Sequence, residues 1–140
     1  MPCLNEILIA ERGMGAFLNN KKIFVSKVSH LNNALLMYGS LRFFKERKEG
    51  LINLSDSCAS SRSLVSPYQF HLLASGRCDI VVDAYDKMWD LGPFVVAIEE
   101  AGGKVTSLDG NEWNYNDIGC VATNGILHDQ ALRIINSKKA

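Results

Sequence analysis

The fold is decided by the stretch Trp89-Asp90-Leu91-Gly92-Pro93-Phe94-Val95-Val96-Ala97-Ile98-Glu99-Glu100-Ala101-Gly102-Gly103. Its apolar residues recur at helical spacing, and the closing pair of glycines is typical of a helix end. Asp90 is expected to cap the N-terminus of this helix, with Pro93 in its first turn. Such a terminus gathers free amides and partial positive charge, which suits a phosphate group. A carboxylate there is also a candidate ligand for Mg²⁺, although the spacing equally allows Asp90 to be only a cap.

Helices and strands alternate on both sides of this stretch. The run Ser66-Pro67-Tyr68-Gln69 resembles a capping box and predicts a helix that starts with Ser66 at its N-cap and ends at Gly76. Strands are expected at residues 78–82, 104–106 and 119–123, and a last helix at 126–136. This alternation favours an α/β layer with mostly parallel strand pairing.

The N-terminal part has a different pattern. Residues 6–10, 16–18 and 22–25 are expected to form short antiparallel strands around a turn at Asn19-Asn20, and residues 35–38 a fourth strand. The charged cluster at 45–49 is expected to be a solvated helix face that Gly50 interrupts. The serine-rich run at 55–66 indicates loop and strand edges. We expect one domain over residues 1–140, with an antiparallel part at 1–39 and an α/β part at 40–140.

Composition narrows the class of protein. The chain has 140 residues, of which 47% are apolar, with 15 Lys+Arg against 15 Asp+Glu. This balance predicts a folded domain and argues against nucleic acid as a partner. No apolar run is long enough for a membrane span, and the first residues do not read as a signal peptide. The four widely spaced cysteines then indicate reduced thiols and a cytoplasmic protein, and the three scattered histidines do not suggest a zinc site.

Trp89-Asp90, followed by Glu99-Glu100-Ala101-Gly102-Gly103, resembles the C-terminal signature of the inositol monophosphatase family. The similarity extends along nearly the whole chain. Leu73-Ala-Ser-Gly-Arg77 with Asp79 resembles the family's small-residue helix end and strand. Pro2, Asn5-Glu6 and the run from Ala10 to Asn19 resemble the strand-and-turn segment that precedes the family's second half.

The resemblance implies the C-terminal half of a layered α/β/α/β/α sugar-phosphatase fold, with a mixed, mostly parallel sheet, flanking helices and a remnant of an antiparallel sheet before it. It also implies a Mg²⁺-dependent, lithium-sensitive phosphomonoesterase acting on a small polyol or sugar-like phosphate ester. Carried over by position, Asp90 is the metal ligand and Asp83 binds substrate hydroxyls. The backbone at Leu64, Val65 and Ser66 lies against the substrate.

The histidinol-phosphatase-like branch of the family has counterparts of Arg62 and Lys87, and the latter is a further candidate for substrate binding. That branch usually carries an acidic residue where this chain has Ser66. Each candidate also has a plainer interpretation. Ser66 is sufficiently explained as a helix cap, Asp83 as a turn residue at a strand end, and Lys87 as a surface lysine.

The family's primary metal site combines a glutamate pair with an Asp-Pro-x-Asp-Gly-Thr/Ser motif, and this motif does not occur in the chain. Two hypotheses follow. In the first, the chain is half of a phosphatase, is inactive alone and needs a missing N-terminal half. In the second, it is a non-catalytic remnant that forms a homodimer through an open sheet edge and acts as a regulatory module.

Overall fold

The computed structural model describes residues 1–64 and 66–137. A five-stranded sheet has the order β5-β4-β6-β8-β7, and a separate three-stranded sheet has the order β1-β2-β3. The strands are β1 (Leu8–Glu11), β2 (Gly15–Leu18), β3 (Lys21–Ile23), β4 (Leu35–Tyr38), β5 (Ser60–Ser63), β6 (Ile80–Asp83), β7 (Lys104–Thr106) and β8 (Cys120–Thr123). The helices are α1 (Lys48–Ser57), α2 (Tyr68–Ala74), α3 (Met88–Glu100) and α4 (His128–Ile135), joined by short 3₁₀ turns.

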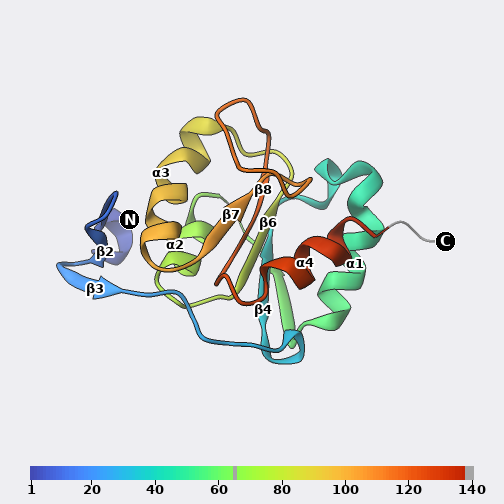
Figure 1. Cartoon of the computed structure of the whole chain (residues 1–140), viewed down its shortest axis with the longest axis horizontal. Helices are drawn as coiled ribbons and strands as arrows, with labels where there is room; N and C mark the ends of the chain where they lie inside the picture. The colour runs from blue at the N-terminus through green and yellow to red at the C-terminus, as the bar shows by residue number, and fades with distance from the viewer. Residues whose placement is uncertain (65, 138–140) are drawn as a thin grey trace.

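The elements stack as layers (Figure 1). α2 and α3 cover one face of the five-stranded sheet, and α1 and α4 cover the other. The three-stranded sheet packs on the outer side of α3. Alternation along β6 fills both cores, because Val81 packs toward α2 and α3 while Ile80 and Val82 pack toward α1 and α4. The expected α/β architecture preceded by short antiparallel strands is therefore confirmed.

The five-stranded sheet is mixed. β4 pairs in parallel with β5 and β6, whereas β8 pairs antiparallel with both β6 and β7. Four of the five strands thus run in one direction, but the reversed β8 lies between β6 and β7, so two of the four pairings are antiparallel. The parallel share is therefore smaller than the alternation of helices and strands suggested, because alternation fixes the direction of strands and not their neighbours.

The place of β4 corrects the expected boundary at residue 39. Leu35–Tyr38 does not extend the antiparallel meander. It lies inside the five-stranded sheet, between β5 and β6. Its burial explains the difference, since Leu36 and Met37 are both buried, one in each core. A strand buried on both faces belongs at the centre of a covered sheet.

Both predicted helix caps are wrong. α2 begins at Tyr68 after Pro67, and no side-chain hydrogen bond caps it, so Ser66 is not an N-cap. α3 begins at Met88 after Lys87, which places Asp90 inside its first turn and Pro93 in its second. In the folded chain both Ser66 and Asp90 line a pocket at the strand ends instead of capping a helix.

Gly50 also departs from expectation, because it lies within α1 and does not interrupt it. A Cβ at this position would lie 2.7 Å from the carbonyl carbon of Ile135 in α4. The glycine therefore allows the two helices to approach closely. Glycine has a low helix propensity, so its presence in α1 is explained by the close packing of the two helices.

Two carboxylates fasten the three-stranded sheet to the helical layer. Glu100, near the end of α3, accepts hydrogen bonds of 2.8 Å from the backbone amides of Gly13 and Gly15. These bonds lower the pKa of Glu100. They also explain why a carboxylate stands at the C-terminal end of a helix, where the helix dipole disfavours it.

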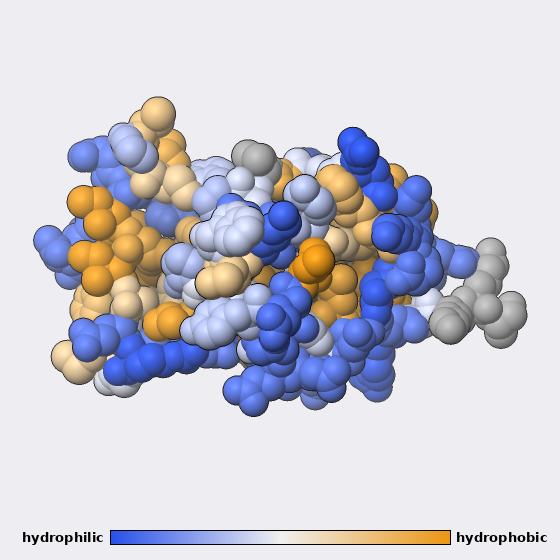
Figure 2. Space-filling view, turned by 90° about the horizontal axis from the view of Figure 1, so that it is seen from above, coloured by the Kyte–Doolittle hydropathy of each residue, from blue (hydrophilic) through white to orange (hydrophobic). Residues whose placement is uncertain are grey.

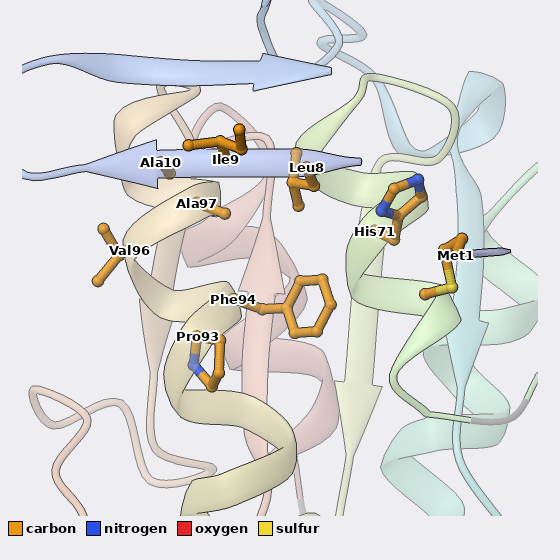
Figure 3. A pocket seen from close by; sticks show the side chains of 9 residues that line it. All are labelled: Met1, Leu8, Ile9, Ala10, His71, Pro93, Phe94, Val96 and Ala97. Carbon is orange, nitrogen blue, oxygen red and sulfur yellow. The ribbon is translucent and has the colours of Figure 1, made fainter. Parts of the chain in front are cut away.

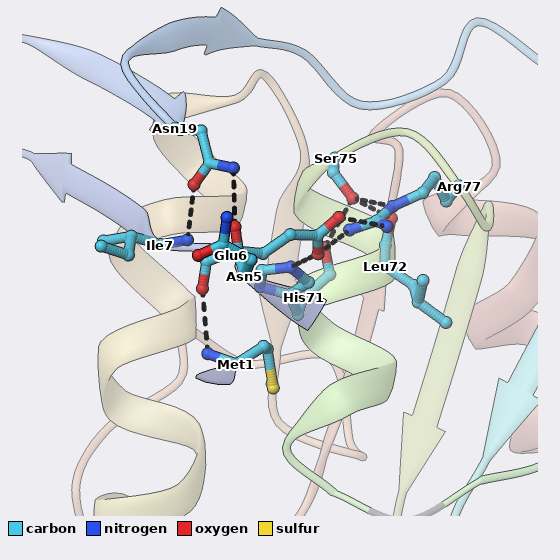
Figure 4. Close-up of polar contacts among 9 residues, drawn as sticks. All are labelled: Met1, Asn5, Glu6, Ile7, Asn19, His71, Leu72, Ser75 and Arg77. Atoms are coloured by element: carbon cyan, nitrogen blue, oxygen red, sulfur yellow. Dashed lines mark hydrogen bonds and ion pairs between the residues drawn. The ribbon is translucent and has the colours of Figure 1, made fainter. Parts of the chain in front are cut away.

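Glu6 is the second anchor (Figure 4). Its carboxylate accepts two hydrogen bonds of 3.0 Å from the guanidinium of Arg77 and lies 2.6 Å from Nε2 of the buried His71. The Met1 ammonium donates to the backbone carbonyl of Glu6 at 3.0 Å. The Arg77 and His71 side chains hold the pKa of Glu6 at about 2. The segment before β1 is thus tied to the end of α2.

Candidate functional site

A pocket of about 540 Å³ opens at the carboxyl ends of the parallel strands β4, β5 and β6. The crossovers from β4 to β5 and from β5 to β6 run through α1 and α2, which lie on opposite faces of the sheet (Figure 1). In open α/β sheets, ligands bind in the crevice outside the carboxyl ends of the strands. The pocket is lined by Tyr38, Gly39, Ser40, Leu41, Phe43, Ser63, Leu64, Ser66, Asp83, Tyr85, Asp86 and Asp90.

Four of the sequence-predicted site residues meet in this pocket: Leu64, Ser66, Asp83 and Asp90. Lys87 lies outside it, with an exposed side chain whose ammonium is 5.3 Å from the centroid of the Trp89 ring. Val65 is outside the described residues. The folded chain therefore gathers most of the candidates in one place, while their chemical roles stay predictions.

Asp83 forms the buried floor of the pocket at the end of β6. Its Oδ1 accepts hydrogen bonds from the backbone amides of Tyr85 (2.8 Å) and Asp86 (3.0 Å), and its Oδ2 accepts one from Nε2 of Gln69 (3.0 Å). Gly39 lies directly against it, since a Cβ there would be 2.9 Å from Asp83 Cγ. Asp83 thus shapes the turn after β6 and retains little accepting capacity for a ligand.

Asp86 is a pocket residue that the sequence did not single out. It is 7% exposed, and its Oδ2 has no hydrogen-bond partner. Burial raises its pKa to about 6; the nearby Ser66 side chain opposes the shift, and the carboxylates of Asp83 and Asp90 add to it. The Ser66 hydroxyl is itself buried without a hydrogen-bond partner. Ser66 thus favours the ionised form of Asp86, although the contact between the two side chains falls short of hydrogen-bond geometry.

A signal for Asp86 and Gly39 was present in the sequence. Both follow expected strands directly or within a turn, and the ends of parallel strands are where sites form. This signal becomes useful only when the strand at 35–38 is known to lie beside the strand at 80–83. The sequence analysis placed these two strands in different parts of the domain.

A second hollow, of about 520 Å³, lies between β1 and α3 (Figure 3). Its walls are mostly apolar, including Leu8, Ile9, Phe94, Val96 and Ala97. Further exposed apolar side chains lie around the three-stranded sheet, namely Leu4, Ile7, Met14 and Phe24. Figure 2 shows hydrophobic surface gathered at this end of the molecule. Such a surface is typical of an interface.

The model of the inositol monophosphatase family matches residues 1–140. The chain belongs to this family. Histidinol-phosphatase of Mycobacterium tuberculosis is 34% identical over 143 residues, a match that covers 97% of the chain and 55% of that relative. The chain therefore spans about half the length of the curated relatives it matches, as their C-terminal portion.

Solved structures agree with the fold. An inositol monophosphatase of Thermotoga maritima superposes with a TM-score of 0.87 at 31% identity, covering 96% of this chain and 53% of that one. The extragenic suppressor protein suhB of Bartonella henselae gives a TM-score of 0.91 at 24% identity, covering 99% and 55%. The resemblance inferred from the Trp-Asp and Glu-Ala-Gly-Gly motifs is thus confirmed.

The family is metal-dependent, so the pocket can be tested for Mg²⁺ donors. Asp90 is half-buried on the pocket wall, and Asp86 offers an unpartnered carboxylate oxygen; both are hard oxygen donors of the kind Mg²⁺ prefers. Over residues 1–64 and 66–137, however, no group of three or more His, Cys, Asp or Glu side chains is arranged to hold a metal ion. The chain's own residues fit part of a metal site and not a whole one.

All four cysteines are free, in agreement with reduced thiols, and burial raises the pKa of Cys58 to about 11 and that of Cys78 to about 12. Within the described part of the chain, no helix has the length and apolar character needed to cross a bilayer.

Proposed function

We propose that this chain is the C-terminal half of a Mg²⁺-dependent phosphomonoesterase that hydrolyses a small polyol or sugar-like phosphate ester. The observation that carries the proposal is the meeting of Asp83, Asp90, Leu64 and Ser66 in one pocket at the strand ends. A cytoplasmic location and sensitivity to lithium accompany this proposal as expectations from the family.

Each residue would have a separate task. Asp90 would hold Mg²⁺ from the first turn of α3, where free amides also favour an anionic group. When bound, the metal would supply a more acidic water and stabilise charge on the ester oxygen. Asp83 would use its remaining lone pair for a substrate hydroxyl. Leu64 and Ser66 would border the substrate, and Lys87 would reach it only if its side chain left Trp89.

The remaining metal ligands would come from a segment equivalent to the N-terminal half of the relatives. β1 is an edge strand of the three-stranded sheet. On the side of β1 that faces β2, the backbone amide of Asn19 donates a hydrogen bond to the carbonyl of Ile7. By alternation, the backbone groups of Leu8 and Ala10 point to the free edge. A complementary half would add strands there and fill the apolar hollow beside α3.

The test is phosphate release from small esters. The chain alone is expected to be inactive, and co-expression with the N-terminal half of the Mycobacterium tuberculosis histidinol-phosphatase should give Mg²⁺-dependent activity. Asp90→Asn should abolish that activity, whereas Asp56→Asn, an exposed change on α1, should leave it unchanged. If the chain alone is active and Asp90→Asn removes this activity, the proposal that the metal site needs ligands from both halves is wrong. An assembled but inactive complex would contradict the phosphatase assignment.

The second candidate function is a non-catalytic module that pairs with another copy of itself. It is favoured by the free edge of β1 and by the exposure of Ile9, which is 56% accessible on that strand. The module should sediment as a dimer, and Ile9→Lys should make it monomeric. Ile52→Lys, at a similarly exposed isoleucine of α1, should not. A monomer at all concentrations would rule this candidate out.

A further inference from the structure

A buried histidine stands at the edge of the apolar hollow between β1 and α3. His71 is 2% exposed, and its imidazole ring lines the hollow beside Leu8 (Figure 3). Nε2 of the ring is 2.6 Å from Oε2 of Glu6, a carboxylate whose pKa is held at about 2. An ionised carboxylate only accepts hydrogen bonds, so Nε2 carries the proton in this contact.

The second ring nitrogen of His71 is still available. Nδ1 makes no hydrogen bond with residues 1–64 or 66–137, and it is not among their sealed polar atoms, so it keeps access to the hollow. In the neutral ring Nδ1 is a bare acceptor, whereas in the imidazolium it becomes a second donor that carries charge. The protonation state of His71 therefore sets the polarity of one edge of an otherwise apolar hollow.

The charged and titratable groups that face His71 are few. Glu6 contacts it from the segment before β1, and Arg77, which follows α2, donates to the same carboxylate. Met1 lines the hollow, with its ammonium on the Glu6 carbonyl, and the Tyr68 ring stacks on the imidazole at 6.0 Å. β1 and α3 line the hollow with apolar side chains. Histidine ordinarily changes charge between about pH 5 and pH 8, whereas Glu6 stays ionised throughout that range.

The occupant of the hollow is indicated by the part of the relatives that the chain does not span. The match covers 55% of the Mycobacterium tuberculosis histidinol-phosphatase, as its C-terminal portion, so the rest of that relative precedes the residue matched by Met1. Met1 itself lines the hollow, next to the free edge of β1. A segment equivalent to the N-terminal half, with apolar side chains turned toward α3, therefore fits here.

We propose that His71 makes the docking of this segment dependent on pH: the neutral imidazole permits docking and its protonation weakens it. The inference rests on the proposed function for the identity of the docked segment, and it adds a regulation to the assembly of the site.

The physical reason is the loss of solvent at Nδ1. Apolar side chains that fill the hollow leave Nδ1 without a partner. An uncharged acceptor tolerates this better than a charged donor does, because a buried charge without a counterpart is the more costly of the two. Docking therefore favours the neutral ring. By linkage, protonation of the ring disfavours docking to the same extent.

The experiment uses the full 140-residue chain co-expressed with the N-terminal half of the Mycobacterium tuberculosis histidinol-phosphatase. Sedimentation at pH 8 and at pH 5.5 gives the dissociation constant of the complex. The wild type should dissociate about tenfold or more readily at pH 5.5, which corresponds to one pKa unit of linkage. His71→Gln keeps an amide donor for Glu6 and does not titrate, so its affinity should be nearly the same at both pH values.

The other two histidines provide the controls. His30→Gln, at an exposed position, should retain the pH dependence of the wild type. His128 should not contribute, because burial lowers its pKa to about 4, below the range tested. The partner half is the same in every sample, so a difference between variants belongs to this chain. Should His71→Gln fail to fold, His71→Leu, which is apolar and does not titrate, takes its place.

Three results would each overturn the proposal: equal wild-type affinity at the two pH values, a pH dependence that survives in His71→Gln, or no complex at pH 8. A dimer of the chain alone with the same pH dependence would make a second copy the occupant and overturn the choice of partner. The phosphatase can fail separately, since pH-dependent assembly without phosphate release would leave the role of His71 and remove the enzyme. Phosphate release from a complex whose assembly ignores pH would do the reverse.

Discussion

Gln69 donates a hydrogen bond of 3.0 Å from Nε2 to Oδ2 of Asp83, and both side chains are buried. The bond joins the first turn of α2 to the carboxyl end of β6. It holds the floor of the pocket in place, because the other oxygen of Asp83 is committed to the turn that leads to Asp86. A residue that the capping-box pattern assigned to the helix backbone thus orients a carboxylate of the site.

Gln69→Glu should destabilise the chain at neutral pH. The change removes the donor and sets a second carboxylate against Asp83 in a buried place, which should cost about 1–3 kcal/mol of unfolding free energy. Urea unfolding measures the loss, and it should diminish as the pH falls and one of the two acids takes up a proton. Gln130→Glu, exposed on α4, is the control and should change little. An equal effect of the two variants would mean that the bond is not formed in solution.

Gly39→Ala should displace the Asp83 carboxylate through a steric clash and so destabilise the fold. The added methyl carbon would lie 2.9 Å from Asp83 Cγ, so the carboxylate must move. We expect a loss of about 1–3 kcal/mol in unfolding free energy. The matched control is Gly92→Ala within α3, where the nearest atom to a Cβ is 3.9 Å away on Trp113 and better helix propensity should add up to about 1 kcal/mol. Opposite signs for the two variants are the decisive result.

The sequence predicted most of the fold because its helices and strands carry strong local patterns. The run around Phe94 and Ile98 formed the expected helix, and the pattern before Asn19 formed the expected antiparallel strands. It could not predict that Leu36 lies between β5 and β6, since strand neighbours are set by packing between distant segments. Nor could it predict that Gly50 sits inside a helix, because the reason lies on α4.

The sequence predicted site residues only where they belong to a motif of the family. Asp83 and Asp90 were found through the family's spacing, and they do line one pocket. Asp86 belongs to no motif and becomes visible only as an unpartnered oxygen in the folded chain. Lys87 was assigned to the site by position in the sequence, yet its side chain points to Trp89 instead. Side-chain direction at a loop end is decided by local packing, and sequence position does not report it.

Glu6→Gln should alter how stability depends on acid. The pKa of Glu6 is held at about 2 against an ordinary value of 4.5, first by Arg77 and then by His71. A depressed pKa means that the carboxylate stabilises the fold above about pH 4.5, and that this stabilisation fades as the pH falls toward 2. Wild type should therefore exceed Glu6→Gln in urea midpoint at pH 7, and the gap should narrow toward pH 3. Glu11→Gln on β1 serves as the control, and a gap that stays constant with pH would contradict the anchor.

Asp86→Asn should change the dependence of stability on pH in the opposite direction to Glu6→Gln. The folded protein raises the pKa of Asp86 from 3.8 to about 6, chiefly through burial. Between those values the folded state binds the proton more tightly than the unfolded state does, so stability falls as the pH rises through this window. Above about pH 6 the charged group costs up to about 3 kcal/mol, which the neutral amide should avoid.

The measurement is the unfolding free energy of wild type and Asp86→Asn from pH 4 to pH 8. The variant should gain on the wild type as the pH rises and show no advantage near pH 4, with Asp56→Asn as the exposed control. A variant that is less stable than wild type at pH 8 would show that Asp86 already has a partner in solution, such as the Ser66 hydroxyl.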